Sequence, residues 1–502
     1  MANKIPNPAE IQQEISDFLK KKYGDNIVVP NPDIMRPPEE GPSTKDDSLN
    51  INFNLKPEEL EEFLNQYVIN QQEAIEILAT KICTHFNRMK LETSSNFEEL
   101  VGNIKSNILM IGPTGVGKTY LIKLIAHKIG VPFVKGDATK FSETGYVGGD
   151  VEDLVRELVH EAKGNIKLAE YGIIYLDEID KIATSGHTYG PDVSRTGVQR
   201  NLLKLMEESE VDLKTPHDLG AQMEAAMEAQ RTGKVTRKKI NTKNILFVVS
   251  GAFFGLVDII KKRLNQQSMG FSLEPLSKRG SDNNDYLSKA KSEDFIEFGF
   301  ESEFIGRLPV TVQLNELDVE SLYRILKSPN STVIMGKKRD FQAYGIQIEF
   351  EEGALRLIAQ MAYEERIGAR GLVSIAEKVL MKYEKKLPST EIKQFTVTKE
   401  IVQNPEKELE NLLNRECMKK FQRDFLAITG IIITFTPEAQ KIVAEMAKKK
   451  NVTFNDISRE LFADYEYGLK LLDIPEFTID EKILQEPKKH LEVLIKNSYH
   501  SK

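Results

Sequence analysis

The sequence contains no tryptophan and only two cysteines, Cys83 and Cys417, which lie far apart along the chain. Two such cysteines supply neither a disulfide framework nor the four ligands of a structural zinc site, so a disulfide-rich secreted scaffold is excluded. A long hydrophobic run is also missing, because the longest nearly apolar stretch, 245–257, has 13 residues and is too short to span a bilayer. The opening residues have no apolar core of the signal-peptide kind. These absences predict a cytoplasmic protein without a membrane segment.

Excess positive charge is absent as well. Lysine and arginine number 68 against 76 aspartates and glutamates, which gives a formal net charge of −8. Proteins that hold nucleic acid along a channel usually carry a basic surface, so we expect no nucleic-acid partner. With 502 residues, 40% of them hydrophobic, the chain is long enough for several domains and apolar enough for sizeable cores.

The first fifty residues differ in composition from the rest of the chain. Residues 1–50 hold seven of the twenty prolines, and the stretch 36–50 (RPPEEGPSTKDDSLN) has the composition of a linker. We therefore expect a proline-rich amino-terminal arm and linker over 1–50.

Between residues 51 and 315, apolar runs alternate with helical patterns. The runs at 107–112, 132–136, 172–177 and 244–250 are short and almost continuously apolar. Such runs are typical of strands buried on both faces of a parallel sheet. The pattern predicts an α/β fold with a wound parallel sheet in a large domain over 51–315.

The carboxyl-terminal part of the chain contains a repeat. RDFQAYGIQIEF at 339–350 recurs as RDFLAITGIIITF at 423–435, and FTVTKEIVQNP at 395–405 recurs as FTIDEKILQEP at 477–487. Shared apolar positions alone would fit helical periodicity, but the matching Arg-Asp-Phe, glycine and proline favour a duplicated unit of about 85 residues. The two small domains expected from this repeat cover 316–405 and 406–502.

A phosphate-binding loop follows the first apolar run. GPTGVGKT at 112–119 has the form G-x-x-x-x-G-K-[ST], with a strand pattern before it and a helix pattern after it. Its backbone N–H groups can cradle the β-phosphate, Lys118 can neutralise the β- and γ-phosphate oxygens, and Thr119 can offer a hydroxyl to Mg²⁺. ATP and Mg²⁺ are therefore the expected cofactors. The expected nucleotide-binding residues of this loop are Gly112, Pro113, Thr114, Gly115, Val116, Gly117, Lys118, Thr119 and Tyr120.

An acidic pair follows the third apolar run. Asp177 and Glu178 lie in IIYLDEID at 173–180, about 60 residues beyond Lys118. Alone, such a pair is usually a solvated helix start, but at the end of the next-but-one strand from a phosphate loop it indicates hydrolysis. Asp177 can hold Mg²⁺ through water, and Glu178 can polarise the attacking water. Lys118, Asp177 and Glu178 are thus the expected catalytic residues of an ATPase.

With these motifs in place, the chain resembles the AAA+ ATPases and, among them, the ClpX/HslU group of protein unfoldases. The similarity covers residues 55–405 and is greatest to ClpX. It implies an AAA+ P-loop core over 51–315 and a small lid domain over 316–405. The repeat over 406–502 is then a second, degenerate lid-like copy.

Two arginines acquire roles through this resemblance. EFIGRLP at 303–309 resembles the segment whose arginine reaches the γ-phosphate of the neighbouring subunit, which implies that Arg307 is a catalytic arginine finger. GARG at 368–371 resembles the lid motif whose arginine contacts nucleotide, which is Arg370 here. A planar, permanently charged guanidinium suits the charge that builds on a transferring phosphoryl group. Without its context, Arg307 would be interpreted as a surface salt bridge.

Two further segments of the nucleotide site follow from the resemblance. YVINQQEA at 67–74 resembles the segment that packs near adenine, which implies that Val68 and Ile69 bind nucleotide. Asn70 stands where the family usually has glycine. Ser250, at the end of the fourth apolar run, is the candidate for the phosphate-sensing polar residue known as sensor 1.

A short glycine-flanked segment is the candidate for contact with a polypeptide. GYVGGD at 145–150 sets an aromatic and an aliphatic residue between glycines, where neither a strand nor a helix pattern requires them. One interpretation is a surface turn with an exposed tyrosine. The resemblance implies instead the axial pore loop that grips a polypeptide. Its candidate residues are Gly145, Tyr146, Val147 and Gly148, with the side chains of the middle pair gripping and the glycines allowing movement.

A second loop is the candidate for contact with a peptidase. SMGFS at 268–272 occupies the position of the ClpX loop that docks into the ClpP peptidase ring. The alternative is a loop with a chance apolar triplet. The residues expected to dock are Met269, Gly270 and Phe271.

Two features depart from ClpX. The proline-rich arm stands in place of its zinc-binding amino-terminal domain, so the choice of substrate and adaptor should differ. The second lid-like copy has Asn455 at the position corresponding to Arg370. We therefore expect that copy to bind no ATP.

The function expected from these residues is that of an ATP-dependent protein unfoldase and translocase. By resemblance it is a homohexameric ring that threads unfolded or tagged proteins and supplies the ATPase component of a ClpP-like protease. One alternative is a stand-alone AAA+ remodelling chaperone without a peptidase. A DNA-remodelling AAA+ ATPase is disfavoured by the Tyr-Val pair and by the acidic chain. A non-catalytic AAA+ scaffold is disfavoured because Glu178 and Arg307 are both present.

Overall fold

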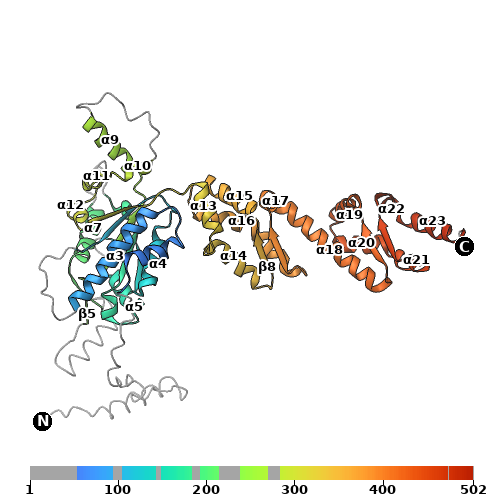
Figure 1. The fold of residues 1–502 in the computed structure, drawn as a ribbon, viewed down its shortest axis with the longest axis horizontal. Coiled ribbons are helices and arrows are strands. Elements are labelled where there is room, and N and C mark those ends of the chain that lie inside the picture. Colours follow the sequence, from blue (N-terminus) through green and yellow to red (C-terminus); the bar gives the residue numbers. More distant parts are fainter. Residues whose placement is uncertain are drawn as a thin grey trace, which may run out of the picture. The chain divides into compact units, whose positions relative to one another are not determined.

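The computed structural model describes residues 54–93, 105–142, 149–183, 193–213, 238–268, 283–472 and 474–500 (Figure 1). The expected arm over 1–50 lies outside these residues. So do the expected pore-loop residues Gly145, Tyr146, Val147 and Gly148, and the expected docking residues Met269, Gly270 and Phe271.

A five-stranded parallel sheet forms the centre of the large α/β region. Its strands run in the order β2-β3-β6-β1-β7. The three central strands are buried along nearly their whole length, as a sheet covered on both faces requires. The predicted parallel α/β sheet is confirmed. The strand bounds are β1 Ile108–Ile111, β2 Phe133–Asp137, β3 Ile173–Asp177, β6 Leu246–Gly251 and β7 Val310–Gln313.

The strand β7 was not predicted from the sequence. Its four residues alternate between buried and partly exposed positions, so they form no continuous apolar run. It pairs with β1 at the edge of the sheet, where one side of a strand needs no partner.

Helices cover the sheet, and β4 and β5 form a separate two-stranded antiparallel sheet. Two glycines let helix α5 approach closely: a Cβ atom on Gly136 would lie 2.6 Å from Leu154 and one on Gly172 would lie 2.7 Å from Leu158. Because these two positions carry no side chain, α5 packs directly on β2 and β3. The bounds in this region are α2 Pro57–Asn65, α3 Gln72–Thr93, α4 Lys118–Ile129, α5 Asp153–Glu161, α6 Ile166–Ala169, α7 Val193–Met206, β4 Glu210–Asp212, β5 Lys239–Asn241, α9 Leu256–Ser268, α10 Asn283–Leu287, α11 Ser292–Phe298 and α12 Ser302–Gly306.

The residues after β7 form two successive groups of helices, each with a two-stranded parallel sheet. The first group contains α13 Val319–Lys327, α14 Thr332–Gln342, β8 Gln347–Phe350, α15 Glu352–Glu364, α16 Arg370–Lys386, β9 Gln394–Val397 and α17 Lys399–Gln403. The second contains α18 Pro405–Thr429, β10 Ile432–Phe435, α19 Pro437–Lys450, α20 Phe454–Phe462, α21 Tyr465–Leu471, β11 Glu476–Ile479, α22 Glu481–Gln485 and α23 Pro487–His500.

The same tyrosine contacts occur in both groups. In the first, the Tyr383 hydroxyl donates to the Pro405 carbonyl over 2.9 Å, and its ring lies 5.0 Å from that of Phe395. In the second, the corresponding hydrogen bond measures 2.8 Å and the ring distance 5.6 Å. The residues that repeat these contacts are Tyr465, Pro487 and Phe477. Burial raises the pKa of both tyrosines, so each hydroxyl remains a donor at neutral pH.

Helix α18 belongs to both groups. It packs against α16 and α17 of the first and against α20 and β10 of the second. Pro405 is its first residue, where the missing N–H has no intrahelical partner to lose, and Gly430 ends it in the left-handed conformation at φ 76°. Among the described residues, no helix combines the length and apolar character that crossing a bilayer would need.

Candidate functional site: the nucleotide pocket

A pocket of about 390 Å³ lies at the carboxyl ends of β1 and β3. Ligands bind at this edge of open α/β sheets, and the volume is within the usual range for small-molecule sites. The phosphate loop, the segment before α3, and residues of α14 and α16 supply its walls. The predicted residues that line it are Val68, Ile69, Thr114, Gly115, Val116, Gly117, Lys118, Thr119, Tyr120, Asp177, Glu178 and Arg370.

The phosphate loop joins β1 to α4 in a conformation that needs glycine. Gly115 and Gly117 have φ angles of 80° and 100°, in the left-handed region that other residues rarely adopt. A Cβ atom on Gly115 would lie 2.1 Å from the carbonyl oxygen of Ile367, so the loop also needs glycine for close packing. The Gly115 carbonyl accepts a 2.9 Å hydrogen bond from the backbone N–H of Ala369. The loop is therefore bonded directly to the GARG segment.

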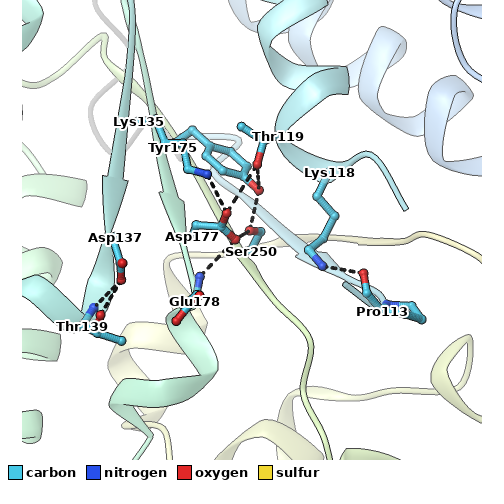
Figure 2. Close-up of polar contacts among 10 residues, drawn as sticks. All are labelled: Pro113, Lys118, Thr119, Lys135, Asp137, Thr139, Tyr175, Asp177, Glu178 and Ser250. Carbon is cyan, nitrogen blue, oxygen red and sulfur yellow. Dashed lines mark hydrogen bonds and ion pairs between the residues drawn. The ribbon is translucent and has the colours of Figure 1, made fainter. Parts of the chain in front are cut away.

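Lys118 lies at the first turn of α4 with only 9% of its surface exposed. Its Nζ donates to the carbonyl oxygen of Gly112 over 2.6 Å. It also donates to that of Pro113 over 2.9 Å (Figure 2). These two residues hold the lysine and are not among the pocket-lining residues. Burial lowers the pKa of Lys118, and the carboxylates of Asp177 and Asp180 oppose that shift. The cation is thus kept beside the loop whose motif recognises phosphate.

Asp177 is the centre of the polar network in Figure 2. Its Oδ1 accepts hydrogen bonds from Ser250 Oγ at 2.9 Å and from the Glu178 N–H at 3.1 Å. Its Oδ2 lies 2.9 Å from Lys135 Nζ and accepts from Thr119 Oγ1 at 3.4 Å. Burial raises the pKa of Asp177. The bonds from Lys135 and Ser250 lower this pKa by more than burial raises it, so the net shift is downward. The carboxylate is ionised at neutral pH.

A buried tyrosine connects these groups and was missed by the sequence reasoning. Tyr175 is fully buried on β3, and its hydroxyl lies 2.6 Å from Ser250 Oγ while accepting from Thr119 Oγ1 at 3.2 Å. Burial raises its pKa well above the usual value, with the Asp177 carboxylate adding to the shift, so the phenol stays neutral. Its position inside an apolar run concealed it. Tyr175 also contacts the candidate sensor residue Ser250, which bonds to Asp177.

Thr119 and Asp177 have the donor set of a magnesium site. Both offer oxygen, the ligand that Mg²⁺ prefers, and Mg²⁺ commonly takes one or two protein ligands together with substrate phosphates and water. The described residues contain no cluster of three or more His, Cys, Asp and Glu side chains that would make a protein-only metal cage. The pair therefore fits a metal that arrives with a nucleotide.

Glu178 directly follows β3 in a strained backbone conformation. Its φ of 57° lies in the left-handed region, which is unfavourable for a residue with a Cβ atom and is often found at functional sites. The side chain is exposed and lines the pocket. A carboxylate here is accessible to a water molecule near a bound phosphate.

The segment before α3 is anchored to the residues that follow β7. Gln71 is 1% exposed, and its side chain exchanges two hydrogen bonds with the backbone of Asn315, at 2.9 and 2.8 Å. Asn330 donates to the Gln66 carbonyl at 3.3 Å. Asn70 adopts φ 62°, a left-handed conformation that asparagine tolerates better than most residues. This explains how asparagine can stand where the resembled family has glycine.

Much of the wall opposite the phosphate loop was missed. Apart from Ala369 in GARG, the missed residues of this wall belong to no motif. Their part of the chain is held at the pocket by the contact between Gly115 and the GARG segment and by hydrogen bonds to the segment before α3. The lining residues that were not predicted from this part of the chain are Leu317, Ile325, Ser328, Asn330, Ser331, Thr332, Val333, Ala369 and Val373. From the sheet side, the missed residues are Asp180, Lys181, Gly251, Ala252 and Phe254.

Arg307 is not brought into this pocket. It ends α12, its side chain is half exposed, and its Nη2 lies 2.5 Å from Glu207 Oε1. Asn107, just before β1, donates to the Arg307 carbonyl over 3.1 Å and thereby holds its backbone at the amino-terminal end of that strand. The phosphate loop follows the opposite end of the same strand. Within one chain, Arg307 is therefore separated from Lys118 and Glu178.

Comparisons with known proteins agree with this geometry. The "AAA domain (Cdc48 subfamily)" profile matches residues 103–311, and the profile of the "C-terminal, D2-small domain, of ClpB protein" matches residues 317–403. Proteins named "ATP-dependent Clp protease ATP-binding subunit ClpX" from Borrelia duttonii (strain Ly) and Borrelia recurrentis (strain A1) are each 38% identical over 381 residues, covering 74% of this chain and 84% of theirs. The chain belongs to the ClpX family of AAA+ ATPases.

A third ClpX, from Treponema denticola, is 37% identical over 351 residues, covering 69% of this chain and 81% of its own. The predicted family and the predicted ATPase activity are thereby confirmed. As an AAA+ ATPase of the ClpX family, the chain binds nucleotide. The roles of the individual site residues remain predictions.

Proposed function

We propose that this ClpX-family ATPase is a protein unfoldase and translocase that acts as a ring of identical subunits, by resemblance a hexamer. The observation that carries the ring is the separation of Arg307 from the pocket lined by Lys118, Asp177 and Glu178. An arginine finger that is remote from its own nucleotide site can act on the site of a neighbour, which makes hydrolysis depend on assembly.

Each predicted residue then has a distinct task at that pocket. Lys118 binds the β- and γ-phosphate oxygens once it leaves the loop carbonyls, and Glu178 accepts a proton from the attacking water. Thr119 and Asp177 would hold Mg²⁺, which neutralises phosphate charge when bound. Arg307 of one subunit stabilises the charge that develops on the nucleotide of the next.

The predicted pore loop starts from a braced base close to this pocket. Phe141 and Gly149, on either side of the loop, form an isolated parallel bridge, and the Gly149 N–H donates to the Lys140 carbonyl over 3.1 Å. The segment follows β2, whose last residue lies opposite Asp177 on β3. Movement around Asp177 during hydrolysis can thus be transmitted to the base of the loop that carries Tyr146.

The decisive experiment compares ATP-driven unfolding with ATP hydrolysis. The substrates are fluorescent proteins with unstructured terminal extensions, and the test variant is Tyr146→Ala. We expect unfolding to be lost while most ATPase activity remains, because the side chain grips substrate and does not contact nucleotide. Tyr467→Ala removes a tyrosine that is 73% exposed in α21 and serves as the matched control, which should unfold normally. Undiminished unfolding by Tyr146→Ala would contradict the proposal.

We further propose that the ring is the ATPase component of a ClpP-like protease and delivers unfolded substrates to its peptidase. The support is the name of the relatives, "ATP-dependent Clp protease ATP-binding subunit ClpX". Deleting residues 269–271 should abolish co-purification with a ClpP-like ring and leave ATP hydrolysis intact. Retained co-purification would contradict docking through this triplet, and unfolding without any peptidase complex would favour the stand-alone chaperone.

A further inference from the structure

A lysine outside every recognised motif contacts Asp177, the magnesium ligand proposed above. Lys135 lies on β2, and its Nζ is 2.9 Å from Asp177 Oδ2 (Figure 2). The side chain of Lys135 is 42% exposed and that of Asp177 is 18% exposed. A single pair at such exposure contributes little to stability. The contact is therefore of interest for magnesium binding, because Lys135 contacts one particular carboxylate oxygen, Asp177 Oδ2.

The register of two strands explains how the lysine reaches this position. Lys135 lies opposite Tyr175, and Asp137 lies opposite Asp177, in the parallel pairing of β2 with β3. Gly136 faces α5, and side chains alternate between the faces of a strand, so Lys135 lies on the other face. Its Nζ is 6.0 Å from the Tyr175 ring centroid. Because β2 is the edge strand, a long side chain can extend across β3 toward the site.

The two oxygens of Asp177 have different partners. Oδ1 accepts from Ser250 and from the Glu178 backbone, both of which are neutral donors. Oδ2 contacts Thr119 and the ammonium of Lys135. A magnesium ion or its water shell held between Thr119 and Asp177 would use Oδ2, since this oxygen faces the threonine. Lys135 is therefore a like-charged competitor at the same atom, and the partial burial of Asp177 strengthens the repulsion.

We propose that Lys135 is a positioning residue whose ammonium group acts as an internal cation at Asp177 Oδ2. It thereby sets the magnesium concentration at which nucleotide binds to the site. The inference rests on the magnesium site proposed above. Lys135 holds the carboxylate in one orientation before the metal binds, and it must yield or share Oδ2 when the metal arrives. Removing the charge leaves that oxygen to magnesium alone.

The test is a magnesium titration of nucleotide binding by the full-length chain. Binding of a fluorescent ATP analogue is measured without any requirement for hydrolysis. Lys135→Met preserves the length of the side chain and removes its charge, so the magnesium concentration at half-saturation should fall by about three- to tenfold. Lys135→Arg keeps a cation and should stay within about twofold of wild type, since the charge is what competes. Lys140→Met removes an exposed lysine of the same segment and should match wild type.

Each remaining outcome has a defined meaning. A midpoint that stays unchanged in Lys135→Met overturns the proposal, because an incidental surface pair would behave in this way. A raised midpoint also overturns it, since the lysine would then assist the metal. Thermal unfolding without nucleotide identifies loss of folding, and Lys135→Gln provides a second uncharged variant if the methionine variant fails to fold. If wild-type affinity does not respond to magnesium at all, the magnesium site itself fails, and this inference fails with it.

Discussion

Glu178 and Asp177 are adjacent carboxylates with different environments. Asp177 is partly buried and accepts four contacts that fix its orientation, and those from Lys135, Ser250 and the Glu178 N–H lower its pKa. Glu178 is exposed, and its backbone is held in a left-handed conformation. A fixed, ionised carboxylate suits metal binding, whereas an accessible one suits proton transfer from water. The two neighbouring carboxylates thus have different surroundings, which fit the separate roles predicted for them from the sequence.

The first prediction at this scale concerns Glu178→Gln. The amide cannot accept the proton from water, so ATP hydrolysis should fall by about 10²-fold or more while nucleotide affinity stays close to wild type. Steady-state hydrolysis and equilibrium binding of a fluorescent nucleotide measure the two effects. Glu157→Gln removes an exposed carboxylate on α5 and should leave both unchanged. Hydrolysis that persists in Glu178→Gln would remove this residue from the catalytic role.

The second prediction concerns pH and His85, a residue outside the nucleotide site. Burial lowers the pKa of His85 to about 4, although the bond between its Nε2 and the Asn244 carbonyl opposes this. Between pH 6.5 and pH 4 the unfolded chain binds a proton that the folded chain does not, so stability is lost as the pH falls through this window. At pH 5 the loss relative to pH 7 should be about 2 kcal/mol.

Thermal unfolding at several pH values measures this effect. His85→Gln cannot titrate, so its unfolding temperature should depend less on pH over the same window than that of wild type. His127→Gln removes an exposed histidine of α4 and should retain the wild-type dependence. Equal pH dependence in wild type and His85→Gln would show that His85 is not the titrating group.

At the scale of secondary-structure elements, the sequence predicted the strands and loops that a short stretch of residues specifies by its composition or spacing. Four strands were found as continuous apolar runs, and the phosphate loop was found because its glycines, lysine and threonine occupy fixed spacings. The strand β7 was missed because its burial alternates. Lys135 and Tyr175 were missed because their contacts depend on the register of β2 with β3, which no spacing along the chain expresses.

The lid side of the pocket was largely unpredictable for a related reason. Residues of α14 such as Thr332 and Val333 lie far from the phosphate loop in sequence and carry no motif. They lie at the pocket because the GARG segment packs against Gly115 and because Asn315 and Asn330 bond to the segment before α3. Arg370 was identified because the GARG motif resembles a motif of a known family. Its apolar neighbours in the pocket belong to no such motif and could not be identified in this way.

The prediction at this scale concerns the second lid-like group. Asn455 is the second residue of α20, and it stands at the sequence position corresponding to Arg370, the first residue of α16. If this group serves packing and does not bind nucleotide, Asn455→Ala should leave ATPase activity within about twofold of wild type, as expected for a change away from the site. Arg370→Ala is the matched change in the first group and should weaken nucleotide binding. A large loss of activity in Asn455→Ala would show that the second group takes part in the ATP cycle.

At the scale of the whole molecule, the predicted catalytic residues of one chain do not all lie in one place. Lys118 and Glu178 line the pocket, while Arg307 pairs with Glu207 elsewhere. Burial lowers the pKa of nearby Lys105 to about 7, and its Nζ donates to the Glu207 carbonyl over 2.7 Å, so the backbone of the residue that pairs with Arg307 is itself anchored. A neighbouring subunit that attracts Arg307 must compete with Glu207.

Mixed rings test whether the finger acts between subunits. Arg307→Ala and Glu178→Gln should each be inactive alone, because each lacks one necessary group. In a random equal mixture, about a quarter of the interfaces would combine an intact Glu178 with an intact Arg307 from the neighbour, so roughly that fraction of wild-type hydrolysis should return. Hydrolysis no greater than the mean of the two separate variants would place the finger in its own subunit.

Helix α18 connects the carboxyl-terminal group of helices to the group that contacts the phosphate loop. Its 25 residues extend for roughly 38 Å, at about 1.5 Å per residue, and they pack against both groups of helices. The first group is bonded to the phosphate loop through Ala369 and Gly115. A small rotation of that group during the ATP cycle would turn α18 as a lever arm, and the displacement would be larger at its far end. The carboxyl-terminal group would then be the most strongly moved part of this region, and anything bound to it would be pulled once in each cycle of hydrolysis.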